Sequence, residues 1–152
     1  MAVSKKQQFI SEHRVARKLA LIAIYQWQMT DNTYEEIYTG LQEDKDLSSD
    51  MPKADMAFFQ ALVKSVMEKT AEIDEVLNPF LDREAKHLDQ IERAALRLST
   101  CEFMNHPEVP YKVIVNESVN LTKKFGADQA HKFVNGVLDK VGAKLRPDES
   151  GK

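Results

Sequence analysis

The sequence is poor in cysteine, glycine and proline, and it has no long hydrophobic run. Its single cysteine, Cys101, cannot form an intramolecular disulfide, which fits a reducing cytoplasm. Glycine and proline occur only five times each, which favours helices over a turn-rich β architecture. No segment reaches the roughly 18 consecutive apolar residues of a membrane span, and the N-terminus has no signal-peptide core. These absences predict a cytoplasmic, helical protein.

The motifs of common catalytic sites are also missing. We find no glycine-rich phosphate loop and no Gly-x-Ser-x-Gly elbow. One cysteine cannot build a thiolate zinc cluster, and no two histidines stand four residues apart as helical metal ligands do. The four histidines are His13, His87, His106 and His131. We therefore predict a binding protein that is not an enzyme and needs no metal or cofactor.

The net charge of −3 conceals two basic ends and an acidic middle. Residues 1–30 carry a net charge of +4, residues 121–146 again +4, and residues 31–120 a net charge of −10. A polyanion could use both basic ends only if they fold onto the same side of the molecule. The acidic middle would then be available to a basic protein partner.

A basic stripe runs along the first predicted helix, which we place at residues 11–29 with Ser11 as its cap. At about 100° per residue, one side of the helix collects Arg14, Arg17, Lys18, Leu21 and Tyr25. The opposite side collects Val15, Leu19, Ile22, Ala23 and Trp27. Fixed cations followed by an aromatic ring suit a single-stranded nucleic acid, which offers phosphates and bases. A solvated helix face that happens to be basic is the competing interpretation.

Apolar periodicity predicts five to seven helices and no strand. Beyond the first, the clearest segments are residues 34–42, 55–77, 89–105, 110–125 and 128–145. We expect residues 55–77 to form one rod roughly 35 Å long, and residues 43–54 to form a polar loop. Residues 1–10 are predicted to be a flexible basic arm, residues 11–147 one helical domain, and residues 148–152 a disordered tail.

The helix at residues 89–105 should be central, because its apolar arc is unusually wide. Asp89 and Glu92 resemble a capping box at its start. Glu102 projects into the apolar arc and should therefore have a hydrogen-bonding or cationic partner. Only four residues form a separate outward strip: Arg93, Arg97, Thr100 and Met104.

A second basic surface is predicted where the last two helices meet. Gly126 is placed for a left-handed helix end, and Asp128 for the cap of the last helix. The exposed candidates for binding are Lys123, Lys124, Gln129, Lys132 and Lys140. Gly136 costs about 1 kcal/mol within a helix, which a close approach by another helix or by an RNA backbone would explain. Phe133 could be a core residue or a stacking platform for a base.

Three segments contain sequence motifs that are more specific than a general helical pattern. The first contains Ile24-Tyr25-Gln26-Trp27-Gln28, and the second is Val109-Pro110-Tyr111-Lys112-Val113-Ile114-Val115-Asn116-Glu117. The third runs from Lys124-Phe125-Gly126-Ala127 into Phe133-Val134-Asn135-Gly136-Val137-Leu138-Asp139-Lys140. Together they resemble the NusB family of bacterial transcription antitermination factors over roughly residues 11–147.

The resemblance implies an all-α fold of about seven helices, packed as two small bundles around a central helix. Members of this family bind boxA RNA of nascent ribosomal RNA transcripts as a heterodimer with NusE, a ribosomal small-subunit protein. The complex joins RNA polymerase and other Nus factors, suppresses termination and supports rRNA processing. The family pattern has a denser arginine run before the first helix, where this chain is diluted by Glu12.

The resemblance also suggests where the protein partner binds. A basic ribosomal protein should favour the acidic middle and the face beyond Tyr25. Glu92 is the best single candidate, and a capping role is compatible with it. Two other interpretations stay open: an RNA-binding accessory domain like those of some rRNA cytosine methyltransferases, and a pure protein–protein adaptor. The chain length argues against the first, since 152 residues leave no room for a Rossmann-type catalytic domain.

Overall fold

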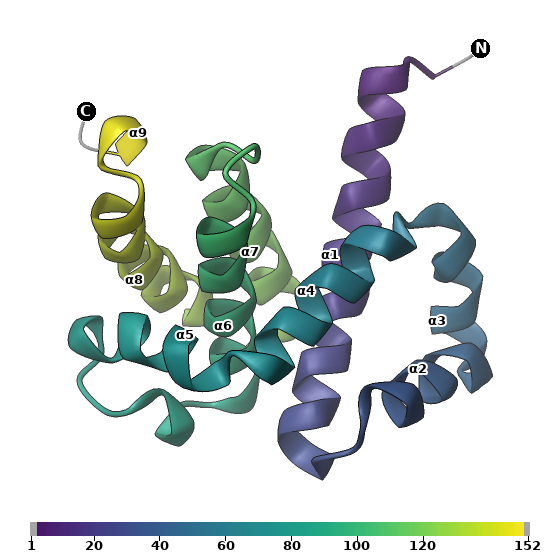
Figure 1. Ribbon diagram of the computed structural model, residues 1–152, viewed down its shortest axis with the longest axis horizontal. Helices are drawn as coiled ribbons and strands as arrows, with labels where there is room; N and C mark the ends of the chain where they lie inside the picture. Colours follow the sequence, from purple (N-terminus) through teal and green to yellow (C-terminus); the bar gives the residue numbers. More distant parts are fainter. Residues whose placement is uncertain (1–2, 151–152) are drawn as a thin grey trace. The chain divides into compact units, whose positions relative to one another are not determined.

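The computed structural model describes residues 3–150, and its regular elements are all helical (Figure 1). Within these residues there are nine α-helices, seven of them with eight residues or more, so the predicted all-α fold is confirmed. The α-helices are α1 Lys5–Thr30, α2 Tyr34–Glu43, α3 Lys45–Asp50, α4 Met56–Glu68, α5 Thr70–Leu77, α6 Gln90–Asn105, α7 Tyr111–Phe125, α8 Ala130–Leu145 and α9 Pro147–Ser150. There are also three 3₁₀ segments in the described residues. Segment η1 Met51–Lys53 follows α3, η2 Asn78–Phe80 follows α5, and η3 Ala85–His87 precedes α6.

The chain divides into two compact units, which we describe separately. The N-terminal unit comprises residues 1–64, with α1, α2, α3 and most of α4. The C-terminal unit comprises residues 65–152, with the end of α4 and helices α5 to α9.

Helix α1 begins earlier than the sequence predicted. Ser4, not Ser11, is its cap: the Ser4 hydroxyl accepts from the Gln7 N–H, and the Gln7 side chain accepts from the Ser4 N–H. This reciprocal pair satisfies two N–H groups that a helix start leaves unbonded, so residues 5–10 are helical instead of forming a loose arm. Figure 1 shows these first turns extending beyond α2 and α3.

The segment predicted as a polar loop is largely helical. The Asp44 carboxylate accepts from the N–H groups of Asp46 and Leu47 and so starts α3 directly after α2. Helix α2 itself lies where it was expected, and Thr33 and Glu36 form a capping box at its start. The loop prediction for residues 43–54 was wrong because it weighed polarity and overlooked a cap signal.

The rod predicted for residues 55–77 is interrupted. Helix α4 ends at Glu68 and α5 begins at Thr70, with Lys69 between them in a non-helical conformation (φ −117°, ψ 25°). The Thr70 hydroxyl donates to the carbonyl of Val66, the local bond by which threonine bends helices. The apolar period continues across the break, so hydrophobicity alone could not reveal it.

Helix α6 is the centre of the C-terminal unit, where it packs against α5, α7 and α8. The prediction of a central helix is therefore confirmed, but its outward strip is wrong. Arg93, Arg97 and Thr100 are all buried. The Arg97 guanidinium donates to both oxygens of Asp74 on α5, at 3.0 and 2.7 Å, which compensates its loss of water.

The start of α6 shows the Asp89 half of the predicted capping box, without a return bond from the Glu92 side chain to the Asp89 N–H. The Asp89 carboxylate accepts from the N–H groups of Ile91 and Glu92. Glu102 lies in the apolar arc as expected, with only 1% of its surface exposed.

The connection between α7 and α8 differs in detail from its prediction. Gly126 follows α7 with an extended backbone (φ −89°, ψ 175°) instead of a left-handed one. A Cβ at this position would lie 2.8 Å from the Thr122 carbonyl oxygen, and this crowding is why glycine fits there. Gln129, not Asp128, is the residue before α8, and it adopts a left-handed conformation (φ 71°).

Another glycine allows α7 and α8 to approach each other closely. A Cβ at Gly142 on α8 would lie 1.9 Å from a ring carbon of Tyr111 on α7. The Tyr111 ring stacks on Phe103 at a centroid distance of 5.7 Å, and its hydroxyl donates to Asp139 at 2.7 Å. Burial, followed by this bond to Asp139, raises the pKa of Tyr111 to about 12.

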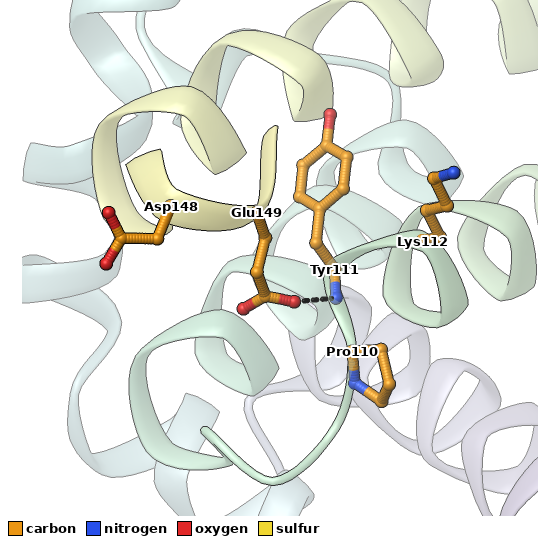
Figure 2. A pocket seen from close by; sticks show the side chains of 5 residues that line it. All are labelled: Pro110, Tyr111, Lys112, Asp148 and Glu149. Carbon is orange, nitrogen blue, oxygen red and sulfur yellow. Dashed lines mark hydrogen bonds between the residues drawn. The ribbon is translucent and has the colours of Figure 1, made fainter. Parts of the chain in front are cut away.

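Buried Arg146 joins the end of α6 to the end of the chain. Its guanidinium donates to the carbonyls of Phe103, His106 and Val109, at 3.3, 2.9 and 2.8 Å. It also donates to Glu149 on α9, and the other oxygen of Glu149 accepts from the Tyr111 N–H at 2.9 Å (Figure 2). Residues 148–150, expected in a disordered tail, belong to helix α9, and the Glu149 side chain of this helix caps α7. Residues 1–2 and 151–152 of the predicted arm and tail lie outside the described residues.

Replacing Arg146 by Met should lower the free energy of unfolding by about 3 kcal/mol, because several buried carbonyls lose a charged donor. Urea denaturation followed by circular dichroism measures the change. The matched control is Arg83→Met, since Arg83 is exposed and its ion pair is with its sequence neighbour Asp82. Equal midpoints for Arg146→Met and the wild type would show that the guanidinium contributes nothing to stability.

Candidate nucleic-acid interface

The burial pattern of α1 corrects its predicted faces. Its buried residues are Ala16, Arg17, Leu19, Ala20, Leu21, Ala23 and Ile24. At 100° per residue they span about 200° of the circumference, centred near Ala20. Leu21 and Arg17 were therefore wrongly placed on the outward side. Three alanines on this arc leave room for close packing, which widens the buried surface beyond the predicted apolar face.

The cations of the predicted stripe have different surroundings. Arg17 is only 5% exposed, and its guanidinium lies 5.3 Å from the centroid of the Phe58 ring. The Lys18 ammonium forms an ion pair with Asp50 at 2.7 Å, and both side chains are largely covered. Arg14 is exposed. Within the N-terminal unit, Arg17 and Lys18 thus have structural roles that the helical wheel did not reveal.

Tyr25 lies half-buried on α1, two turns beyond Lys18. Part of its ring remains accessible, as contact with a base or with a partner protein requires.

A cluster of cations is exposed where α7 ends and α8 begins. Lys123 and Lys124 occupy the last turn of α7, where cations complement the helix dipole, and Lys132 lies in the first turn of α8. All three side chains are exposed, and within residues 3–150 none of them forms an ion pair. We call these three residues the cationic cluster. Because α7 and α8 pack together in one unit, the structure brings its members to the same end of that unit.

Two neighbours complete this end of the unit. Gln129 is exposed, and Phe133 is half-buried one turn into α8. Because Phe133 is partly covered and partly accessible, both proposed roles of its ring stay compatible with the structure. Gly136 is exposed, and no atom lies within 4 Å of the position of its missing Cβ. The explanation of Gly136 by helix packing is therefore wrong.

The exposed face of α7 extends the cationic cluster and was overlooked in the sequence. Lys112, Asn116 and Asn120 are exposed and lead at i, i+4 and i+8 spacing to Lys123. Glu117, the one carboxylate in α7, is buried. The four-residue spacing of these polar residues was the signal that could have identified this surface.

Glu92 occupies the first turn of α6 and is half-buried. Partial burial, and then the nearby charge of Asp89, raise the pKa of Glu92 above its ordinary value, while Arg83 acts in the opposite direction. A partner cation placed against Glu92 would favour the charged carboxylate and so offset both effects. Glu92 therefore stays a candidate for a protein contact.

Cys101 has no features of a reactive thiol. It is buried in α6, and burial raises the pKa of its thiol to about 11, so the thiol is protonated at neutral pH. Its side chain accepts from the Asn105 amide at 3.4 Å. Within residues 3–150 no helix has the length and apolarity that a bilayer crossing requires.

The candidate residues fall into two groups that belong to different units. Arg14, Arg17, Lys18 and Tyr25 lie in the N-terminal unit, whereas the cationic cluster and Glu92 lie in the C-terminal unit. A composite face of both groups stays a prediction.

Comparisons with known proteins first define the class. A protein of Alteromonas mediterranea named transcription antitermination protein NusB is 44% identical over 140 residues, which are 92% of this chain and 97% of that protein. The solved structure of Thermotoga maritima NusB superposes with a TM-score of 0.74 over 91% of this chain and 95% of that chain, at 24% identity. The class is that of bacterial transcription antitermination factors, which are not enzymes.

The family model then identifies the family. The model of the NusB family matches residues 14–143, so this chain belongs to the NusB family. A further solved structure, of antitermination factors NusB and NusE in complex with double-stranded RNA, superposes with a TM-score of 0.66 at 26% identity. The superposition covers 84% of this chain and 93% of that chain.

The structure predicts that the cations of the two groups respond differently to mutation. Arg17→Met should lower the free energy of unfolding by about 2 kcal/mol, because a largely desolvated cation–π contact is lost. Lys123→Met should leave it nearly unchanged, because that side chain is exposed. Urea titrations of both variants test the difference, and equal losses would show that Arg17 is a surface cation after all.

Proposed function

We propose that this NusB-family protein binds boxA RNA of nascent ribosomal RNA transcripts together with NusE, and so supports antitermination and rRNA processing in the bacterial cytoplasm. The observation that carries the proposal is the cationic cluster beside half-buried Phe133. Exposed cations that form no ion pair within residues 3–150 attract phosphates, and a partly accessible aromatic ring can stack on a base. The solved complex of a NusB with NusE and RNA supports it by similarity.

The proposed RNA-contacting residues are Lys123, Lys124, Gln129, Lys132 and Phe133 in the C-terminal unit, and Arg14, Lys18 and Tyr25 on α1 in the N-terminal unit. Lys18 would exchange its ion pair with Asp50 for a phosphate. Arg17 is proposed to support the α1 residues indirectly, through its contact with the Phe58 ring within the N-terminal unit. The proposed partner surface contains Glu92, and Tyr25 is a candidate for both surfaces. The complex with NusE is expected to join the elongating RNA polymerase and other Nus factors.

Exchanging Lys123 and Lys124 together for Gln should weaken RNA binding and flatten its salt dependence. Each phosphate contact to a single strand contributes about 0.7 to the log–log slope, so the slope should fall in magnitude by about 1.4. Fluorescence anisotropy between low and moderate salt, with boxA RNA and saturating NusE, measures both quantities. A matched duplex RNA shows whether the surface prefers single strands.

Tyr25→Ala provides the uncharged comparison. Loss of a stacked base costs roughly 1–3 kcal/mol of RNA affinity without releasing counterions, so the salt slope should stay close to that of the wild type. If the lysine exchange leaves both affinity and slope unchanged, the cluster is a solvated surface and the protein acts as an adaptor between other proteins.

Glu92→Lys should weaken NusE binding by about 2–5 kcal/mol if the carboxylate becomes buried against a cation, and far less if it lies at the rim. Titration calorimetry without RNA measures the affinity. Thermal melting of the same variant controls for stability, since Glu92 lies in the first turn of α6. An unchanged affinity together with an unchanged melting temperature would remove Glu92 from the partner surface.

A further inference from the structure

The glycine at position 136 of α8 is not explained by packing within the described residues. It lies in the middle of a 16-residue helix, where glycine is about 1 kcal/mol less favourable than alanine. No atom would contact a Cβ there, and no described glycine has a positive φ. Gly142, on the same helix, has the opposite character, since a Cβ there would overlap the Tyr111 ring. Packing requires a glycine at position 142 but not at position 136.

The surroundings of Gly136 indicate what could lie against it. Lys132 and Lys140 stand one turn before and one turn after it on the same face, and both are exposed. Neither forms an ion pair within the part of the chain that the structure describes. Asp139, the nearby carboxylate, accepts from the Tyr111 hydroxyl at 2.7 Å and is thereby held towards α7. Two cations thus flank a point where the α8 backbone is bare.

Lys132, Gly136 and Lys140 belong to a longer row of exposed residues along one face of α8. Gln129, Lys132, Gly136, Lys140 and Ala143 recur at spacings of three and four residues, and all of them are exposed. The row is about 21 Å long at 1.5 Å per residue. It starts beside the cationic cluster and has no large side chain at Gly136 or Ala143. A chain lying along α8 would meet cations and amide groups, but no bulky obstacle.

We propose that Gly136 is a seat for the sugar–phosphate backbone of the bound RNA, which passes over α8 between Lys132 and Lys140. A protein helix docking on a glycine would require apolar side chains around it, whereas these flanking residues are lysines. Phosphates require cations and close access, and both are present here. The inference rests on the proposed function and extends the RNA surface from the α7–α8 junction along α8.

If the RNA backbone lies against Gly136, the variant Gly136→Ala should stabilise the protein and weaken its RNA binding. An exposed glycine-to-alanine change in a helix should raise the melting temperature by about 2–4 °C. The added methyl group lifts the phosphate backbone from the helix, and we expect RNA affinity to fall at least about fivefold in the presence of NusE. Gly136→Leu should weaken RNA binding further.

Gly40→Ala is the matched control. Gly40 is also exposed within a helix, and no atom lies within 4 Å of its missing Cβ. It lies on acidic α2 among Glu35, Glu36 and Glu43, so no phosphate should contact it. This variant should gain a similar melting temperature and keep the RNA affinity of the wild type.

Each other outcome has a definite meaning. If Gly136→Ala binds RNA as tightly as the wild type, or if it melts at a lower temperature, the seat is refuted. If it loses affinity for NusE when RNA is absent, the row binds the protein partner and the RNA assignment is wrong. If the wild type with NusE binds no boxA RNA, the proposed function fails instead of the seat.

Discussion

The C-terminal unit depends on the hydrogen bonds that the buried Arg146 guanidinium donates to backbone carbonyls. A helix leaves its last carbonyls without internal partners, and at the end of α6 the Phe103 residue is buried while Asn105 is exposed. The guanidinium supplies donors in a rigid planar fork and reaches the carbonyls of Phe103 and His106 at this end. The same group positions Glu149, whose carboxylate accepts from the Tyr111 N–H at the start of α7. Pro110, the residue before α7, has no side-chain acceptor that could cap this helix. One buried cation thus closes two helix ends.

Burial and partners divide the cations of the described residues into those used within the fold and those accessible to a ligand. Arg17, Arg97 and Arg146 are buried and interact with a ring, a carboxylate or carbonyls, so their charge is already used within the fold. Lys123 and Lys132 have no such partners within residues 3–150 and can meet an external anion. The planar fork of five donors suits these three arginines to buried positions, although Arg14 and Arg83 are exposed. Net charge along the sequence does not make this distinction.

The sequence predicted the helix types and most of their positions, because apolar period and cap residues are local signals. It placed α2 and the Asp89 cap of α6 correctly. It failed where distant residues decide the outcome. The burial of Arg97 depends on Asp74, 23 residues away, and the need for a glycine at 142 depends on the Tyr111 ring. Exposure of the cationic cluster was predictable from helix ends, whereas the burial of Arg17 required knowledge of Phe58.

The single cysteine has a practical consequence. Cys101 lies in the middle of α6, fully buried, and its thiol is protonated at neutral pH. A thiol-modifying reagent can therefore reach it only while the surrounding helices are transiently open. The modification rate of the unaltered protein reports the opening equilibrium of the C-terminal unit, with no engineered label and no competing thiol in the 152 residues. Protection of Cys101 on addition of RNA or NusE would report binding through the dynamics of the helix core.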